Sequence, residues 1–349
     1  MSKKVFVGLS GGVDSSVVAA LLVERGYGVV GVFMKNWSYD VAGHHCPWKE
    51  DLASARSVAA HLNIPLKIYD FQKQYFDAVT KYMLNTYKKG LTPNPDIMCN
   101  QEIKFKVFLK KCLSDGADMI ATGHYARLEG GRLITAKDES KDQTYFLYRM
   151  DPSVADEVLF PIGEYRKSKV RKLASQFNLP TAERPDSQGL CFVGNVPMKD
   201  FLSEFIKPKK GEIINEKGEV VGEHDGAFSY TIGQRHGLGI GGGRPYFVYK
   251  IDTKANKVFV TANEDSELLN SKEMLIADCI WWDKVKVANQ SFEAEVKVRY
   301  RSKSMKCRVT KFSTGKYLVE LSQKERAITP GQSAVFYDGD IVIGGGIIQ

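Results

Sequence analysis

An apolar run near the start of the chain breaks at two glycines and resumes as a second apolar run. Residues 5–9 (VFVGL) are rich in β-branched and aromatic side chains, a composition typical of a buried parallel strand. Gly11 and Gly12 follow, and residues 15–22 (SSVVAALL) have the composition of a helix that packs on that strand. A strand, a glycine-rich turn and a helix N-terminus direct backbone N–H groups and the positive end of the helix dipole at one place. This segment therefore predicts an anion-binding turn.

The anion expected at this turn is a chain of phosphates. The two glycines let the backbone approach it closely, and Ser10 and Ser15 supply hydroxyl donors. Asp14 would repel phosphates unless a cation lay between them, so we expect Mg²⁺ at Asp14. A bare pair of glycines would indicate only a tight turn with a helix cap, but the full hexapeptide SGGVDS is far more specific. The residues expected to contact the nucleotide here are Gly8, Leu9, Ser10, Gly11, Gly12, Val13, Asp14 and Ser15.

The hexapeptide resembles the pyrophosphate-binding loop of the ATP pyrophosphatases. It differs from the P-loop of kinases because no Gly-Lys-Ser/Thr follows it. Members of that superfamily, as the resemblance implies, cleave ATP between its α and β phosphates and pass AMP to a substrate oxygen. ATP and Mg²⁺ are therefore the expected cofactors.

Length and composition are those of a multidomain globular protein. At 349 residues the chain is too long for one ordinary domain, so two or three are expected. No apolar run approaches the ~20 residues that cross a membrane, and the first strand starts too early for a signal peptide, which predicts a cytoplasmic location. The six cysteines are scattered without a Cys-x-x-Cys pair, which argues against a zinc ribbon. The formal net charge of +8 is a weak indication of an acidic partner such as nucleic acid.

Strand-like and helical patterns alternate after the first helix, which predicts an α/β domain with a doubly wound parallel sheet. The further strands are expected at 28–34, 64–70 and 118–124, and helices at 51–62 and 105–113. Ligands of such sheets bind at the carboxyl ends of the strands. Met34 and Gly123 fall at such ends and are candidates to lie near the adenosine. For Met34 the sequence alone supports plain core packing equally well.

Two cysteines lie in loops of distinctive composition. Residues 90–105 (GLTPNPDIMCNQEIKF) form a loop stiffened by two prolines that should hold Asp96 and Cys99 in a fixed relation. If Cys99 lies near the start of the following helix, the helix dipole would favour its thiolate, although a small buried hydrophobe is the more ordinary role. Cys191 lies in a second loop, bounded by glycines, of a kind that can move and expose a thiol.

A short polar stretch, Lys141-Asp142-Gln143, runs directly into an aromatic segment. It is either a surface turn before a helix or a contact to nucleic acid, with Lys141 on a phosphate and Gln143 on a base edge. The sequence leaves both alternatives open.

The pattern changes beyond about residue 200. We expect a catalytic domain at 1–200, a small β-rich middle domain at 201–265 and an antiparallel β-barrel at 274–349, because short glycine-rich runs and then period-two alternation replace the α/β pattern. Outward positions of the barrel carry many cations, whose single sign and the nearby Tyr300 favour RNA over a merely solvated face. These cations are Lys297, Arg299, Arg301, Lys303, Lys306, Arg308 and Lys311.

Taken together, the motifs resemble the tRNA-specific 2-thiouridylases, in the same order along almost the whole chain. The segments that carry the resemblance are SGGVDS (10–15), TPNPD (92–96) with Cys99-Asn100, ATGHYAR (121–127), Lys141-Asp142-Gln143, and Asp186-Ser187 with Gly189 and Cys191-Phe192. The resemblance implies ATP-dependent 2-thiolation of the wobble uridine of tRNAs for Lys, Glu and Gln. AMP is first transferred to the carbonyl oxygen at position 2, and sulfur from a cysteine persulfide then displaces it.

The resemblance also assigns roles to residues of this chain. Cys191 is expected to carry the persulfide, loaded by an upstream sulfur-relay protein or a cysteine desulfurase, and Cys99 to be the partner thiol. Asp96 lies close enough in sequence to act as general acid or base. The partner is the anticodon stem-loop of tRNA, from which the base must flip to reach the site. The residues expected to bind it are Asn94, Pro95, Asp96, His124, Lys141, Asp142, Gln143, Arg299, Tyr300 and Gln332.

Two other functions fit parts of the sequence. An amide or argininosuccinate ligase of the same superfamily would use the nucleotide loop, but it needs neither paired cysteines nor a basic β domain. A non-catalytic RNA-binding protein could keep the fold, but the intact SGGVDS loop argues against loss of nucleotide chemistry. Whether hydrosulfide or the persulfide itself attacks the base stays open.

Overall fold

The fold was analysed in a computed structural model that describes residues 2–186, 196–241 and 243–349. The chain forms two compact units, one of residues 1–80, 95–196 and 338–342, the other of residues 81–94, 197–337 and 343–349. Within the described residues, no helix is both long and apolar enough to cross a membrane.

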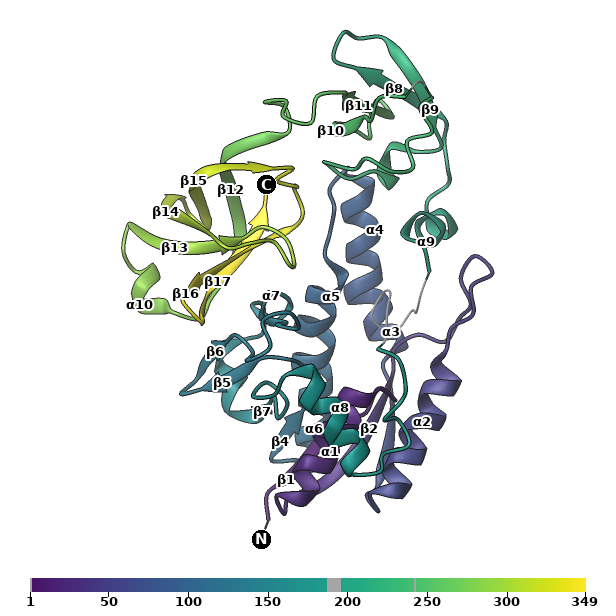
Figure 1. Cartoon of the computed structure of the whole chain (residues 1–349), viewed down its shortest axis with the longest axis vertical. Helices are drawn as coiled ribbons and strands as arrows, with labels where there is room; N and C mark the ends of the chain where they lie inside the picture. Colours follow the sequence, from purple (N-terminus) through teal and green to yellow (C-terminus); the bar gives the residue numbers. More distant parts are fainter. Residues whose placement is uncertain (1, 187–195, 242) are drawn as a thin grey trace. The chain divides into compact units, whose positions relative to one another are not determined.

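The first unit is built on a five-stranded parallel sheet with the strand order β3-β2-β1-β4-β7 (Figure 1). Its strands are β1 (Lys4–Gly8), β2 (Gly28–Lys35), β3 (Leu66–Asp70), β4 (Met119–Ala121) and β7 (Val158–Leu159). The expected parallel sheet is thereby confirmed, because three predicted strands and the strand before the glycine turn all belong to it. The predicted strand 118–124 is shorter than expected, so Gly123 and His124 lie in the loop beyond its carboxyl end.

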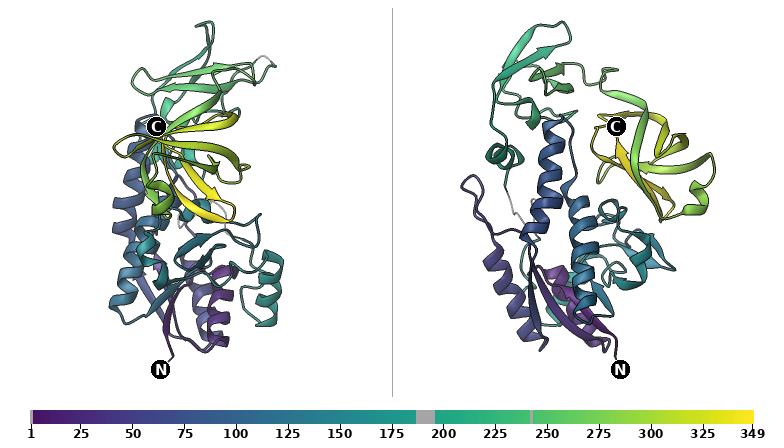
Figure 2. Two further views of the ribbon diagram at one scale, coloured as in Figure 1. Left: turned by 90° about the vertical axis from the view of Figure 1, so that its left-hand side faces the viewer. Right: turned by 180° about the vertical axis from the view of Figure 1, so that it is seen from behind.

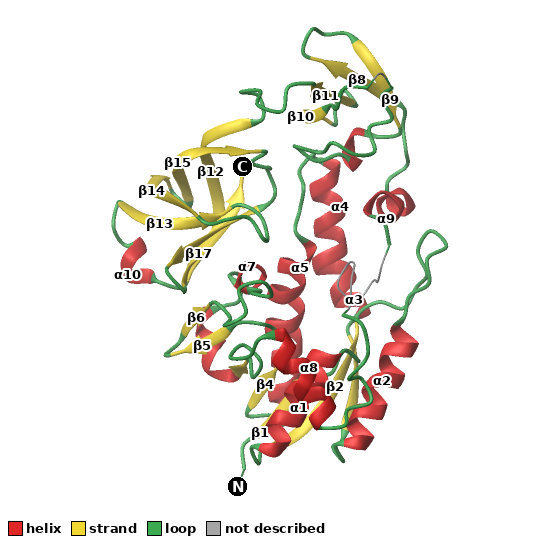
Figure 3. Ribbon diagram, viewed as in Figure 1, coloured by secondary structure: helices red, strands yellow, loops and turns green. Residues whose placement is uncertain are grey.

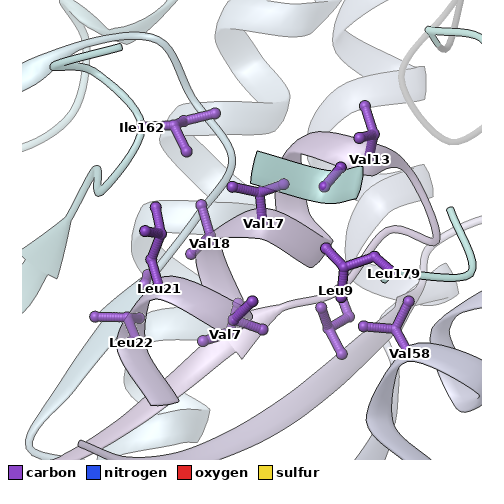
Figure 4. Close-up of a cluster of buried hydrophobic side chains, with 14 of the residues drawn as sticks. Val7, Leu9, Val13, Val17, Val18, Leu21, Leu22, Val58, Ile162 and Leu179 are labelled. Atoms are coloured by element: carbon purple, nitrogen blue, oxygen red, sulfur yellow. The ribbon is translucent and has the colours of Figure 1, made fainter. Parts of the chain in front are cut away.

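Helices α1 (Val13–Glu24), α2 (Trp48–His61) and α8 (Lys167–Gln176) bury their apolar faces in one cluster with alternate residues of β1 (Figure 4). Val7, Val17 and Val58 come from β1, α1 and α2 and have 0% exposed surface. The opposite side of β1 contacts the Phe108 ring, since a Cβ at Gly8 would lie 3.8 Å from it. Helices therefore cover both faces of the sheet, as a doubly wound fold requires.

The remaining elements of this unit include a continuous helical run from α5 through η2 to α6 (Figure 3). They are α3 (Gln72–Tyr75), η1 (Phe76–Thr80), α5 (Pro95–Met98), η2 (Cys99–Phe108), α6 (Leu109–Ser114), β5 (Arg127–Glu129), β6 (Arg132–Ile134), α7 (Thr144–Leu147) and the 3₁₀ helix η3 (Pro152–Glu157). Both η1 and η2 are π-helical, a rare geometry that occurs frequently at functional sites.

The second unit contains a small four-stranded sheet and a barrel (Figure 2). The small sheet has the order β10-β11-β8-β9, and its core includes Ile213, Val248 and Val258. The strands of this sheet and the helices of the same unit outside the barrel are α4 (Lys81–Lys88), α9 (Met198–Phe205), β8 (Gly211–Asn215), β9 (Val220–His224), η4 (Ala227–Ser229), β10 (Phe247–Asp252) and β11 (Lys257–Thr261).

Six strands in the order β12-β15-β14-β13-β16-β17 form the barrel, and a β12–β17 pairing closes it through Ile276 and Ile348. Its elements are β12 (Asn270–Trp281), α10 (Lys284–Val287), β13 (Ser291–Lys297), β14 (Met305–Ser313), β15 (Lys316–Arg326), β16 (Ser333–Asp338) and β17 (Ile341–Ile348). Met305, Cys307 and Val309 are buried while the residues between them are exposed, so the predicted alternation and antiparallel barrel are confirmed.

Candidate active site

The glycine turn between β1 and α1 requires glycine for two reasons. Gly11 has a φ of +81°, and a Cβ there would lie 2.5 Å from the Asp51 carbonyl oxygen and 2.9 Å from Arg184 Nη1. Ser16 and Ser15 donate their hydroxyls to the Gly12 carbonyl, at 2.8 and 3.1 Å. Asp51 and Arg184 thus pack against the turn, and the hydroxyls of Ser15 and Ser16 hold its backbone.

Helix α1 begins at Val13, and its N-cap residue Gly12 provides no side-chain cap. The first amides of a helix have no partner inside the helix, and a helix N-terminus carries a partial positive charge. The exposed Ser10 hydroxyl lies 3.2 Å from Ser15 Oγ at this end of α1. The arrangement suits an anion bound by backbone amides and hydroxyls.

Two residues predicted near the adenosine lie against this turn. A Cβ at Gly8 would come within 3.2 Å of the Met34 Cε atom, so the Met34 side chain packs beside the end of β1. A Cβ at Gly123 would lie 3.0 Å from Ser15 N, so only glycine allows this close approach to the first turn of α1. The structure thus brings Met34, Gly123 and the glycine turn together at the carboxyl ends of β2, β4 and β1.

Lys167, the first residue of α8, joins two carboxylates at this turn. Its Nζ donates to both oxygens of Asp14, at 2.7 and 2.8 Å, and lies 2.8 Å from Asp186 Oδ1. The Lys167 side chain is only 13% exposed. The Tyr125 hydroxyl also donates to Asp14 Oδ1, at 2.9 Å, and burial together with the Asp14 charge raises the pKa of Tyr125. Tyr125 is therefore a neutral donor to Asp14.

Asp186 is bound by three cations. Besides Lys167, Lys141 Nζ donates to its Oδ2 at 3.1 Å and Arg171 Nη2 to its Oδ1 at 2.5 Å. Burial opposes ionisation of this carboxyl, but the hydrogen bonds from Lys167 and Lys141 outweigh it and lower the pKa of Asp186 to about 2. Asp186 is thus an anion at neutral pH.

Arg184 connects the same segment to the glycine turn. Its Nη1 donates to the Gly11 carbonyl at 2.7 Å and its Nη2 to Asp51 Oδ1 at 2.5 Å. Burial raises the pKa of Asp51, and the hydrogen bond from Arg184 counteracts this shift. The sequence analysis missed Lys167 and Arg184; the only signal was that Lys167 starts a helix after another strand of the sheet.

The carboxylate of Asp14 is a suitable ligand for Mg²⁺ only when the Lys167 ammonium has moved away from it. Mg²⁺ is usually held by one or two carboxylates together with phosphate oxygens and water. Asp14 and Asp186 both contact one ammonium, so they are close enough to serve, but both oxygens of Asp14 are occupied by Lys167. No group of three or more metal-ligating side chains occurs in the part of the chain that the structure describes. Asp14 therefore fits the ion together with bound phosphates once the Lys167 ammonium has moved.

Cys99 starts η2, directly after α5. The helical segment begins at Pro95, so Cys99 is its fifth residue, and the residue has 0% exposed surface. The helix dipole acts mainly within the first turn, so the expected thiolate-favouring position near the helix start is occupied by Asp96 instead. Asn94, Pro95 and Asp96 are all half-buried. Cys191 lies outside the described residues.

His124 is a neutral, buried side chain between two hydrogen-bonding groups. Its Nε2 lies 3.2 Å from Lys104 Nζ and its Nδ1 2.7 Å from Thr122 Oγ1. Because an ammonium can only donate, Nε2 accepts and the proton resides on Nδ1. Burial and the Lys104 charge lower the pKa of His124 well below its ordinary value. Lys104 in turn belongs to η2, the element that starts at Cys99.

The segment Lys141-Asp142-Gln143 bonds within the first unit. Asp142 is buried and accepts hydrogen bonds from Ala136 N at 3.0 Å and from Thr144 Oγ1 at 2.7 Å. Gln143 Oε1 accepts from Tyr125 N at 2.9 Å. Gln143 thus holds the loop that carries Tyr125, Asp142 ties Ala136 to Thr144, and Lys141 contacts Asp186.

Gln332 supports the loop that leads to Asn94. Its Nε2 donates to the carbonyl oxygens of Thr92 at 2.9 Å and Pro93 at 3.1 Å. Gly331 beside it has a φ of +91°, and a Cβ there would lie 2.9 Å from Thr92 N. Both residues therefore hold the chain just before Asn94.

The cations of the barrel are less one-sided than predicted. Arg308 pairs with Glu293 at 2.8 Å across β13 and β14, and Arg299 donates to Glu325 at 2.9 Å. Arg301 stacks over the Tyr300 ring with 5.2 Å to its centroid. Two of the seven cations predicted to face RNA therefore have glutamate partners in the structure.

Three family models match successive segments of this chain. Residues 3–195 match the tRNA methyl transferase HUP domain, 199–262 the tRNA methyl transferase PRC-barrel domain, and 271–348 the aminomethyltransferase beta-barrel domain. A solved 4-thiouridine synthetase in complex with RNA and ATP is 18% identical and covers 56% of this chain and 46% of its own, with a TM-score of 0.40, too low to bear on function.

Much stronger similarity is found to two bacterial proteins named tRNA-specific 2-thiouridylase MnmA. The protein of Francisella tularensis subsp. novicida (strain U112) is 46% identical over 357 residues, covering 99% of each chain. That of Bacillus subtilis (strain 168) is 45% identical over 351 residues, covering 99% of this chain and 95% of its own. The predicted family and enzyme class are thereby confirmed: the chain belongs to the tRNA-specific 2-thiouridylases, a family of sulfurtransferases.

Proposed function

We propose that this enzyme uses ATP to convert the wobble uridine of tRNAs for Lys, Glu and Gln to 2-thiouridine. The observation that carries the proposal is the uncapped N-terminus of α1 with Gly123 packed against it, in a chain of this family. Such a site binds a phosphate chain, and activation of a carbonyl oxygen by AMP is the chemistry that a poor electrophile such as uracil needs.

In the first step the uracil oxygen at position 2 attacks the α-phosphorus of ATP and pyrophosphate leaves. The amides of α1 and the hydroxyls of Ser10 and Ser15 hold the phosphates, and Lys167 moves from Asp14 to the pyrophosphate, where charge develops. Asp14 would hold Mg²⁺, which would neutralise phosphate charge when bound together with ATP. Asp186 keeps the Lys167 side chain in reach while it changes partners.

In the second step sulfur replaces the activated oxygen. The Cys99 thiolate attacks the inner sulfur of a Cys191 persulfide, which forms a Cys99–Cys191 disulfide and releases hydrosulfide. Hydrosulfide attacks carbon 2 and AMP leaves with the former carbonyl oxygen. An external dithiol then reduces the disulfide, and a sulfur-relay protein or cysteine desulfurase reloads Cys191. Direct attack by the persulfide is the alternative route.

The RNA partner is the anticodon stem-loop. Its target base leaves the stack and enters a pocket formed by Asn94, Pro95 and Asp96, with Asp96 as general acid or base. The Gln332 hydrogen bonds to Thr92 and Pro93 support this role, because they hold the chain just before the pocket.

Nucleoside analysis tests the proposal. Anticodon stem-loop RNA incubated with the protein, ATP, Mg²⁺ and a persulfide donor should contain 2-thiouridine only when ATP is present. Cys191→Ser should abolish this product but retain ATP–pyrophosphate exchange, whereas Cys279→Ser, a half-buried barrel cysteine, should change neither. Loss of both reactions in Cys191→Ser would contradict the assigned role of Cys191, and absence of 2-thiouridine with the wild-type protein would contradict the proposed function.

A further inference from the structure

A basic cavity of about 200 Å³ lies in the second unit. We call it the lysine pocket and define it by Lys88, Lys207, Lys209, Lys254, Phe228 and Asn256. Lys88 ends α4, Phe228 belongs to η4, and the others come from the segment after α9 and the β10–β11 turn. None of the described residues that line the cavity is acidic.

Asn256 holds the walls of the lysine pocket together. Its Nδ2 donates to the carbonyl oxygens of Lys209 at 3.0 Å and Lys210 at 2.8 Å, and its Oδ1 accepts from Ala227 N at 3.1 Å. Asn256 adopts a φ of 53°, a left-handed conformation that asparagine tolerates better than most residues. The backbone of two walls is therefore tied to one side chain, so the cavity is a built feature of the fold.

The charges in the lysine pocket are not balanced. Neighbouring lysines outside it have carboxylate partners: Lys199 pairs with Asp225 at 2.9 Å and Lys257 with Glu212 at 3.1 Å. Lys88, Lys207, Lys209 and Lys254 are exposed and form no ion pair within the described parts of the chain. Four cations around one cavity raise the local positive potential and favour an anionic ligand.

The geometry and charge favour the sugar–phosphate backbone of RNA over a small anion. Small anions are usually bound by buried amides or an arginine fork, whereas exposed lysines position a nucleic-acid backbone. Lys88 lies six residues before Asn94, so the chain between them spans at most about 20 Å. One RNA arm can reach both.

We propose that the lysine pocket binds a backbone phosphate of the tRNA anticodon arm and so orients the arm for entry of its base. This inference rests on the proposed function, because it assumes that tRNA is the substrate. Contacts to phosphate carry no sequence information, so the pocket should contribute affinity without base specificity.

The test compares two triple variants that remove the same charge. Lys207→Ala/Lys209→Ala/Lys254→Ala removes three of the four lysines of the pocket, whereas Lys199→Ala/Lys210→Ala/Lys257→Ala removes lysines that have carboxylate partners in the same domain. Affinity for tRNA is measured by filter binding from 50 to 200 mM salt, and thiolation by nucleoside analysis. The pocket variant should lose about tenfold in affinity at 100 mM salt, and its slope of log K against log salt should fall by roughly 1–2.

Further measurements separate the possible failures. The pocket variant should show a raised KM for tRNA and an unchanged kcat, and the matching lysine-to-arginine triple variant should restore affinity. Equal affinity in the pocket and control variants, while the wild type thiolates tRNA, would overturn this inference alone. Tight binding of inorganic phosphate by the pocket without any effect of the variant on tRNA affinity would assign it to a small anion and overturn it too. Failure of the wild type to bind tRNA would overturn the proposed function together with this inference.

Discussion

Two groups of basic side chains in this protein are arranged in opposite ways. The first group lies at the glycine turn between β1 and α1, called the nucleotide turn below. Its members Lys141, Lys167, Arg171 and Arg184 each contact a carboxylate, at distances from 2.5 to 3.1 Å. In the lysine pocket the four lysines have no carboxylate partner among the described residues. The first group is partly buried and the second is exposed.

This difference indicates two ways of binding phosphate. A half-buried cation between carboxylates is held in one place, and a ligand must exchange with its partner; removal of such a cation leaves carboxylates uncompensated. An exposed lysine is hydrated and mobile, and its phosphate contact is driven by the release of counterions from the nucleic acid. We therefore expect large, specific effects at the nucleotide turn and modest, salt-dependent effects at the lysine pocket.

The largest expected effect is that of Lys167→Met. Without the ammonium, Asp14 and Asp186 lose a shared partner and the pyrophosphate loses a cation, so ATP–pyrophosphate exchange should fall by about 10²–10³-fold. Lys169→Met, two residues along α8 at an exposed position, is the matched control and should stay near the wild-type rate. Exchange by Lys167→Met within threefold of wild type would show that the paired cation has no part in adenylation.

The next effect tests how tightly the nucleotide turn is packed against its charged neighbours. Gly11→Ala and Gly26→Ala share the same backbone strain, with φ of +81° and +80°, but a Cβ at Gly11 meets Asp51 and Arg184 whereas one at Gly26 meets nothing within 4 Å. We expect Gly26→Ala to cost about 1–2 kcal/mol of unfolding free energy, and Gly11→Ala to cost roughly 1–3 kcal/mol more. Gly11→Ala should also weaken ATP binding at least tenfold.

Urea unfolding and calorimetric titration with ATP measure both quantities. Equal destabilisation by the two substitutions, with ATP binding intact, would mean that the turn relaxes freely and that the contacts with Asp51 and Arg184 are incidental.

In the wild-type enzyme, salt should change the KM for tRNA more than the KM for ATP. Raising salt from 50 to 200 mM should increase the KM for tRNA about tenfold or more, because each phosphate contact releases counterions. The KM for ATP should change much less, since its cations are partly buried and close to the phosphates. Steady-state thiolation at varied tRNA and at varied ATP gives both values, and an equal rise in both would contradict the distinction.

The sequence predicted the elements whose signals are local. The strand, the two glycines and the start of α1 follow one another within about twenty residues, so composition alone located the turn. The alternation in β14 likewise predicted the barrel. The helix containing Cys99 was placed less well, because the two prolines suggested a longer loop, whereas Pro95 starts the helix, as its fixed φ allows.

The charge network was missed because its partners are distant in sequence. Lys167 and Asp14 are separated by 153 positions, and Arg184 and Gly11 by 173. A single sequence gives no signal for such pairs, and a lysine at a helix start is ordinary. The same limit applies to the barrel, where the pairs Arg299–Glu325 and Arg308–Glu293 were not predicted.

The smallest effect concerns His124, whose neutral imidazole lies beside the Lys104 ammonium. Burial and the Lys104 charge lower the pKa of His124, so the folded protein does not bind the proton that the unfolded chain binds near pH 6.5. This residue should therefore lower the free energy of unfolding by roughly 1 kcal/mol as pH drops from 7.5 to 5.5, and its contribution to stability should be fully present above pH 7.5.

Urea unfolding of the wild type and of His124→Gln at both pH values measures this contribution, because the variant lacks the titrating group and should lose less stability on acidification. The imidazole signals of His124 in an NMR titration provide an independent measurement, and they should not shift between pH 8 and 5.5. A midpoint near pH 6.5 would mean that His124 readily becomes a cation beside Lys104. The contrast would then extend poorly to this pair, since a cationic imidazole would no longer be a neutral acceptor for the Lys104 ammonium.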